Sequence, residues 1–130
     1  MKNLNFSGQL INHKNNLEVF VNLFQFEEEG NTIIYSPAFD LSGYGKTEPE
    51  AKDSFQTALS EFITYTMNKN TLGRELKRLG WNVKVSDFKL RSFKTRTPGL
   101  SDLIQKNTYL QEILNEKEFT KFDHTISVAC

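Results

Sequence analysis

The segment 17–26 is apolar at seven of its ten positions, on both faces, which distinguishes it from a strand that is half exposed to water. Aliphatic residues take its odd positions and phenylalanines take several even ones, so both faces of an extended chain are apolar here. This pattern predicts a central strand covered on each side. The acidic turn 27–31 contains Gly30 and leads into the apolar segment 32–35, which predicts a β-hairpin. A looser alternation over 4–11 predicts an additional N-terminal strand at a sheet edge.

The clearest helix signal begins at Thr47. Thr47 and Glu50 have the spacing of a capping box, in which each side chain accepts a hydrogen bond from a free N–H at the helix start. Apolar residues then recur at spacings of three and four from Ala51 to Ile63. We therefore expect an amphipathic helix over about 48–67, with its apolar stripe packed on one face of the sheet.

Shorter elements are predicted in the second half of the chain. Thr71 has the position of a helix cap and Gly80 that of a helix end, with leucines spaced between them. A returning strand is expected within 81–91.

A turn-forming Pro-Gly pair opens a C-terminal extension, residues 97–130. The helix-start residues Ser101 and Thr108 and the alternation over 122–128 predict helices and a final strand in this extension. An apolar content of 38% and a charged content of 25% are typical of a globular protein. We expect one α+β domain over residues 1–130: an antiparallel-rich sheet with the main helix on one face, the N-terminal strand and the C-terminal extension.

Cysteine and histidine are too scarce for most metal and nucleophile chemistry. The single cysteine, Cys130, is the last residue, so no disulfide can form within one chain and a reducing compartment is expected. No signal-like run or apolar stretch of about 18 residues occurs, which favours the cytoplasm. His13 and His124 each stand alone, a setting in which histidine is usually structural. Since no nucleophile, base and oxyanion donor occur together, we expect no enzymatic activity, metal or cofactor.

The net charge of zero conceals two blocks of opposite sign. Residues 27–62 contain eight acids and two bases, whereas residues 69–96 contain nine bases and two acids. The blocks could face each other or be solvated on separate faces, or the basic block could bind nucleic acid or an acidic partner. Their separation along the sequence does not decide between these interpretations.

Three features of the acidic block are candidates for contact with a partner. The consecutive Glu27, Glu28 and Glu29 would splay to both sides of the hairpin, which is also typical of a solubilising surface turn. Asp40 lies between two apolar residues, so it is either a functional buried acid or the cap of a loop. Tyr44 stands between two glycines in a short strand or turn.

The basic stretch 84–96 is a candidate for RNA binding. Basic side chains bind phosphates and exposed aromatic rings stack on bases. Alternating aromatic and basic residues are more often typical of a strand with one inward and one solvated face. The candidate residues are Lys84, Lys89, Arg91, Lys94 and Arg96, interleaved with Trp81, Phe88 and Phe93.

The residues between 26 and 63 form a recognisable series of turns and caps. Ile34-Tyr35-Ser36-Pro37 ends the hairpin, Gly43-Tyr44-Gly45 follows, and Thr47-x-x-Glu50-Ala51 opens the helix. This series resembles the HicB-like antitoxin family. The family core would span about residues 17–92 here, with the segment after Trp81 as its returning strand.

The resemblance implies a β-β-β-α-β fold similar to a partial ribonuclease H fold that lacks the acidic active site. Members of the family bind and block a small ribonuclease toxin, HicA, often as homo-oligomers, and many carry a DNA-binding unit. This chain departs from them in its N-terminal strand and in a tail that ends in a strand. The resemblance thus implies a non-enzymatic antitoxin-type protein that binds a HicA-like toxin; the alternative is an RNA-binding module that uses residues 84–96. The expected partner-binding residues are Glu27, Glu28, Glu29, Asp40 and Tyr44.

Overall fold

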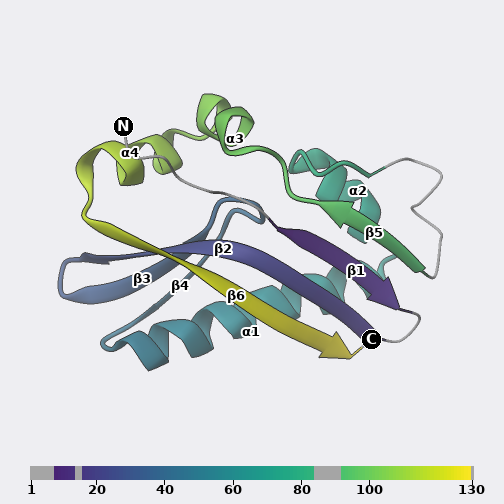
Figure 1. The fold of residues 1–130 in the computed structure, drawn as a ribbon. Coiled ribbons are helices and arrows are strands. Elements are labelled where there is room, and N and C mark those ends of the chain that lie inside the picture. The colour runs from purple at the N-terminus through teal and green to yellow at the C-terminus, as the bar shows by residue number, and fades with distance from the viewer. Residues whose placement is uncertain (1–7, 14–15, 84–91, 130) are drawn as a thin grey trace.

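A computed structural model describes residues 8–13, 16–83 and 92–129. These residues form a six-stranded antiparallel sheet with four helices, which confirms the predicted α+β class (Figure 1). The described elements, in chain order, are β1 (Gln9–His13), β2 (Asn16–Glu28), β3 (Asn31–Ser36), β4 (Leu41–Gly45), α1 (Glu48–Asn68), α2 (Leu72–Arg78), β5 (Ser92–Arg96), α3 (Leu100–Lys106), α4 (Thr108–Glu116) and β6 (Phe119–Ala129).

The sheet is organised around β2, the strand predicted to be central. One edge of β2 pairs with β6 in an unbroken antiparallel register that runs from Asn16 opposite Ala129 to Phe26 opposite Phe119. Because a strand has only two edges, β1 and β3 share the other edge: β1 pairs with the N-terminal part of β2 and β3 with the C-terminal part. The resulting strand order is β4-β3-β2-β1-β5, with β6 beside β2.

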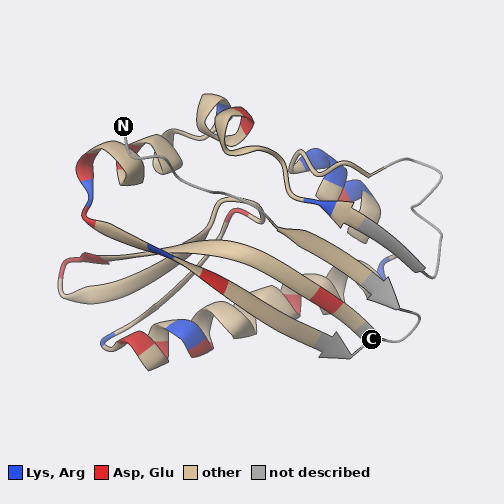
Figure 2. Cartoon of the chain, viewed as in Figure 1, with Lys and Arg blue, Asp and Glu red and all other residues tan. Residues whose placement is uncertain are grey.

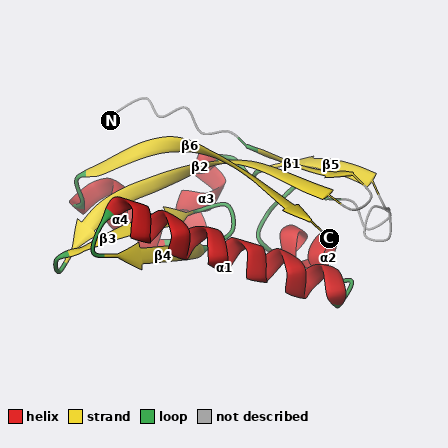
Figure 3. Cartoon of the chain, turned by 90° about the horizontal axis from the view of Figure 1, so that it is seen from below, coloured by secondary structure: helices red, strands yellow, loops and turns green. Residues whose placement is uncertain are grey.

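Helix α1 covers one face of the sheet (Figure 3). Its predicted stripe is buried, with Ala51, Phe55, Leu59 and Ile63 fully inaccessible to water. The helix lies so close to β4 that a Cβ atom on Gly43 would clash with the backbone nitrogen of Phe55. Among the described residues, no helix combines the length and the apolar character needed to cross a membrane.

Helices α3 and α4 lie on the other side of the sheet from α1 (Figure 1). Leu110 and Ile113 of α4 pack with Phe24 and Phe26 of β2 in a second hydrophobic cluster. The C-terminal half of β2 is therefore covered on both faces, as its two-sided apolar pattern predicted. The extension 97–130 supplies this second layer as well as β6.

The structure corrects the expected position of the first strand. β1 does not lie at an edge, because it pairs with β2 on one side and with β5 on the other. An alternation pattern reports which faces of a strand are buried, and it carries no information about how many neighbours the strand has. Residues 4–7 lie outside the described part of the chain.

The structure also corrects two local predictions. The N-cap of α4 is Asn107, whose side chain accepts a hydrogen bond from the Leu110 N–H at 3.0 Å, whereas Thr108 is the first helical residue. Residues 81–83, where the returning strand was expected to begin, are not in a strand. Trp81 is buried and donates its indole N–H to the Ala38 carbonyl at 2.9 Å. The remainder of the expected returning strand, 84–91, lies outside the described residues.

Candidate protein-binding surface

The two charge blocks lie at different ends of the molecule. Figure 2 shows acidic residues gathered around the β2–β3 turn, α4 and the start of α1, and basic residues on α2 and the end of β5. The salt bridges between described residues join Lys52 to Glu48, Arg78 to Glu75 and Lys117 to Glu28. None of these pairs connects the acidic block 27–62 with the basic block 69–96. For the described residues, the two blocks are therefore solvated separately and do not neutralise each other.

The acidic turn between β2 and β3 has a defined geometry. Glu28 is opposite Asn31 in the ladder, so Glu29 and Gly30 form a two-residue loop, and both have positive φ angles, 52° and 80°. Positive φ at both loop positions matches the right-handed twist of a hairpin. Glu27 and Glu29 are exposed, whereas Glu28 is partly buried and its carboxylate lies 3.2 Å from the Lys117 ammonium group. This ion pair fixes the turn against the segment between α4 and β6.

Tyr44 is one of two large apolar side chains that the described surface exposes strongly, with 64% of its area accessible. A Cβ atom on either neighbouring glycine, Gly43 or Gly45, would collide with α1. Gly43 and Gly45 therefore face α1. Because successive side chains of a strand point to opposite faces, Tyr44 points to the other face of the sheet, which α4 covers.

Tyr109 of α4 packs against aromatic rings of β2 and β3. Its ring contacts Tyr35 edge to face, with 5.0 Å between ring centroids. Partial burial raises the pKa of Tyr109, and the carboxylates of Glu28 and Glu112 and then Tyr44 raise it further. Glu28, Glu112 and Tyr44 therefore each lie within electrostatic range of Tyr109, although the four residues come from three separate parts of the chain.

A hollow of about 540 Å³ extends the acidic region between the end of β2 and the start of β6. Glu27 and Glu118 both line it, together with Gln25, Phe119 and Thr120. We call the whole region the acidic–aromatic surface. It is defined by Glu27, Glu28, Glu29, Tyr44, Tyr109, Glu112 and Glu118. It extends around the end of the sheet, since Tyr44 is on the α4 side whereas Glu27 alternates with Phe26 and is on the α1 side.

Asp40, another expected partner-binding residue, lies at the opposite end of β3 from the acidic turn. It adopts a positive φ of 54° and accepts a hydrogen bond from the Tyr35 hydroxyl at 2.6 Å. The same hydroxyl accepts a hydrogen bond from the Asn107 amide at 2.6 Å. Burial, and then the bond to Asp40, raise the pKa of Tyr35 far above its usual range. Asp40 thus helps to attach α4 to the β3–β4 hairpin.

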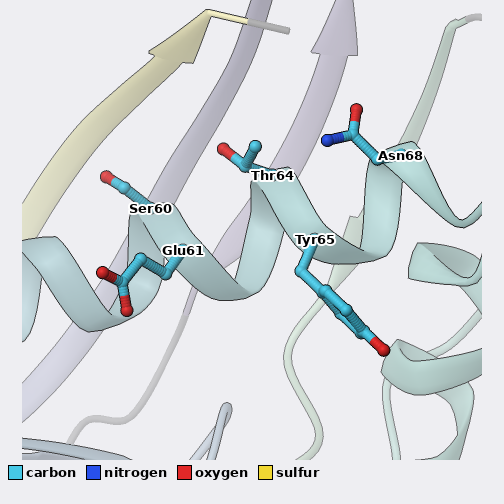
Figure 4. A pocket seen from close by; sticks show the side chains of 5 residues that line it. All are labelled: Ser60, Glu61, Thr64, Tyr65 and Asn68. Carbon is cyan, nitrogen blue, oxygen red and sulfur yellow. The ribbon is translucent and has the colours of Figure 1, made fainter.

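A second hollow lies along the solvent side of α1. Ser60, Glu61, Thr64, Tyr65 and Asn68 line it, and its volume is about 400 Å³. Figure 4 shows that these side chains diverge: Tyr65 points away from Thr64 and Asn68. They do not converge on a common point at which a small substrate could be held.

The two histidines have different surroundings. His13 is the last residue of β1. His124 in β6 packs edge to face against Phe55, with 6.0 Å between ring centroids, and its Nε2 atom is buried without a hydrogen-bond partner. Burial, and then the nearby Lys52 ammonium group, lower the pKa of His124. Within the described ranges, no three His, Cys, Asp or Glu side chains are grouped so that they could hold a metal ion.

The basic end is only partly described. Arg96 at the end of β5 is exposed, and Lys94 lies two positions earlier in the same strand. Lys84, Lys89 and Arg91 lie outside the described residues. Arg74, Lys77 and Arg78 of α2 are exposed at the same end of the molecule (Figure 2).

Sequence reasoning identified the acidic turn and Tyr44 but missed Tyr109, Glu112 and Glu118. These three residues follow the turn by about eighty positions or more, and no motif connects them to it. Only the packing of α4 and the pairing of β6 bring them there. No family model, curated protein or solved structure matches the chain. The resemblance to the HicB-like family therefore stays a prediction.

Proposed function

We propose that this chain is a non-enzymatic protein that holds a basic protein partner on the acidic–aromatic surface. One observation carries the proposal: the strongly exposed Tyr44 lies on the same face of the sheet as Tyr109 of α4, and the carboxylates of Glu28 and Glu112 act on that tyrosine from separate segments. Exposed tyrosines are enriched at protein interfaces, because they contribute apolar area together with a polar group. A surface of one sign also speeds the approach of a partner of opposite charge.

A small ribonuclease toxin of the HicA type is the partner that we propose. Proteins that bind RNA carry basic surfaces to neutralise phosphates, so an acidic surface can occupy the same site in competition with RNA. The chain would then act as an antitoxin in the cytoplasm, and it would need no catalytic group. The HicB-like pattern of turns and caps supports this choice of partner.

The test is co-purification with a small basic protein encoded beside this chain, followed by calorimetric titration of variants. Tyr44→Ala should weaken binding by about tenfold or more, since buried interface tyrosines are frequent hot spots. Tyr65→Ala is a matched control, because Tyr65 is exposed to the same extent, 65%, but lies on α1. The control should bind like the unmodified protein.

A charge test complements the tyrosine test. The double substitution Glu27→Lys with Glu29→Lys should slow association, most strongly at low salt. Asp102→Lys, at an exposed site on α3, provides the control. Equal affinity of the Tyr44 and Tyr65 variants, together with no effect of the charge reversal, would exclude this surface as the binding site.

RNA binding at the basic end is the second candidate function. The exposed Arg96 of β5 favours it, and the exposed Arg74 and Lys77 of α2 add positive charge to that of the stretch 84–96. Fluorescence anisotropy with single-stranded RNA should show affinity that falls steeply with salt. Lys89→Glu with Arg91→Glu, or Arg74→Glu with Lys77→Glu, should abolish it, whereas Lys106→Glu on α3 should not. RNA binding that neither charge-reversed pair weakens would rule out this site.

A further inference from the structure

β6 has a long edge that is open to another strand. Its 11 residues pair with β2 along one edge, and no described strand pairs with the other. An unpaired edge presents a row of backbone N–H and C=O groups that can extend the sheet into a second molecule. The register with β2 contains no bulge, and β6 contains neither proline nor glycine. Two features that commonly protect an edge, a bulge and a proline, are therefore absent from this strand, and its charged side chains are Lys121 and Asp123.

The other end of the sheet is built differently. β4 has only five residues, and the backbone N–H of Tyr44 already donates to the Ser54 hydroxyl of α1 at 3.2 Å. Two residues further along the chain, the backbone N–H of Lys46 donates to the Glu50 carboxylate at 2.9 Å. Side chains of α1 thus occupy donors along β4. Among the described edge strands, β4 and β5 have five residues each and β6 has 11, so β6 is the longest edge at which this sheet can be extended.

The side chains of β6 are complementary to a second copy of the same strand. Lys121 and Asp123 flank Phe122, and both lie on the sheet face opposite α1, next to Phe24 and Asn22 of β2. If two β6 strands pair antiparallel around a two-fold axis at Phe122, each Lys121 stands opposite Asp123 of the other copy. The pairing creates two ion pairs and places the two Phe122 rings side by side.

The contacts of these residues within the chain are compatible with such pairing. Asp123 is exposed overall and accepts a hydrogen bond from the Asn22 amide through one oxygen, Oδ1, which leaves Oδ2 for a lysine. Phe122 is partly buried, with the Lys52 ammonium group 5.1 Å from its ring centre. A second Phe122 ring would enlarge this apolar contact beside α1.

We propose that a second copy of this chain binds along the free edge of β6, so that two sheets join across a two-fold axis at Phe122. Backbone hydrogen bonds supply the affinity, and the reciprocal pairs of Lys121 with Asp123 fix the register. The proposal does not depend on the proposed toxin partner, because Lys121, Phe122 and Asp123 are not part of the acidic–aromatic surface, although Glu118 of that surface directly precedes β6.

Charge exchange provides a sharp test in the full-length chain. Sedimentation equilibrium of the unmodified protein should show a monomer–dimer equilibrium. Lys121→Asp leaves only acids at the two positions and Asp123→Lys leaves only bases, so each variant should dimerise about tenfold less tightly or worse. Mixing the two variants should restore association, because acids of one then face bases of the other. Lys77→Asp, on α2, is the control for a lost positive charge.

The double variant Lys121→Asp with Asp123→Lys should also recover the original dimerisation constant to within about threefold, because it regenerates both pairs in reverse. Circular dichroism identifies any variant that fails to fold. Asp123→Asn is a milder substitute that retains the side-chain shape and should weaken the dimer by a few-fold. A protein that remains monomeric at millimolar concentration would overturn the proposal. So would a dimer that is unaffected by the single substitutions, or one that neither mixing nor the double variant restores.

Discussion

The hydrogen-bonded group of Tyr35, Asp40 and Asn107 allows a quantitative test of how α4 is attached to the sheet. The Tyr35 hydroxyl donates to Asp40 at 2.6 Å and accepts from Asn107 at 2.6 Å, in a side chain that is 1% exposed. Tyr35→Phe removes both bonds with almost no change in shape. A neutral bond contributes about 1 kcal/mol and a bond to a charged group about 1.5–3 kcal/mol.

The free-energy contribution of the bond between Tyr35 and Asp40 must be reduced, because Asp40 is exposed and water can replace the lost donor. We therefore expect Tyr35→Phe to lower the free energy of unfolding by about 2 kcal/mol. That loss is a large fraction of the total stability of a domain of this size, about 5–15 kcal/mol. The measurement is urea unfolding followed by circular dichroism. The slope of the unfolding free energy against urea concentration should be the same for the variant and the unmodified protein, which shows that both expose a similar area on unfolding.

A double-mutant cycle with Asp40→Gly isolates the bond between Tyr35 and Asp40. Asp40 has a positive φ of 54°, so glycine relieves backbone strain while it removes the carboxylate. That backbone contribution is the same in both backgrounds and cancels in the cycle. The coupling energy should be about 1 kcal/mol. A coupling near zero, or a Tyr35→Phe variant as stable as the original, would refute the assigned attachment of α4.

Three other substitutions follow from the packing. Gly43→Ala should destabilise the fold by about 3 kcal/mol in urea unfolding, because the added Cβ would overlap the backbone of Phe55 and separate α1 from β4. A loss of less than about 1 kcal/mol would contradict this close contact. Gly80→Ala should cost about 1 kcal/mol, since Gly80 ends α2 at a φ of 98°. The lowered pKa of His124 means that the unfolded chain binds more protons below its ordinary pKa of 6.5. Stability should then fall as the pH drops from 6.5 through the folded pKa, and His124→Gln should flatten this part of the profile.

Local patterns predicted the elements whose formation depends mainly on neighbouring residues. Thr47 accepts a hydrogen bond from the Glu50 N–H, and the stripe from Ala51 to Ile63 packs on the sheet as its spacing indicated. The apolar segment 17–26 forms most of β2. These predictions succeed because capping, helical periodicity and two-sided burial are encoded within one or a few turns of chain.

The relative placement of these elements had no comparable signal. β1 was expected at an edge and lies inside the sheet, because strand neighbours depend on pairing with β5, about eighty positions away. The cap of α4 is Asn107, where the amide also reaches Tyr35 of β3. Both Asn107 and Thr108 are acceptable caps in isolation, so the choice rests on a contact from another layer.

The sequence by itself determined the class of the protein: a central strand apolar on both faces, a capped amphipathic helix and two blocks of opposite charge. Only the tertiary structure decided that the tail returns as β6 beside β2 and that Tyr109, Glu112 and Glu118 join Tyr44 and the acidic turn. The physical reason is that burial patterns are local, whereas strand pairing and layer packing depend on contacts between residues far apart in the chain. The two surfaces proposed for binding are products of those distant contacts.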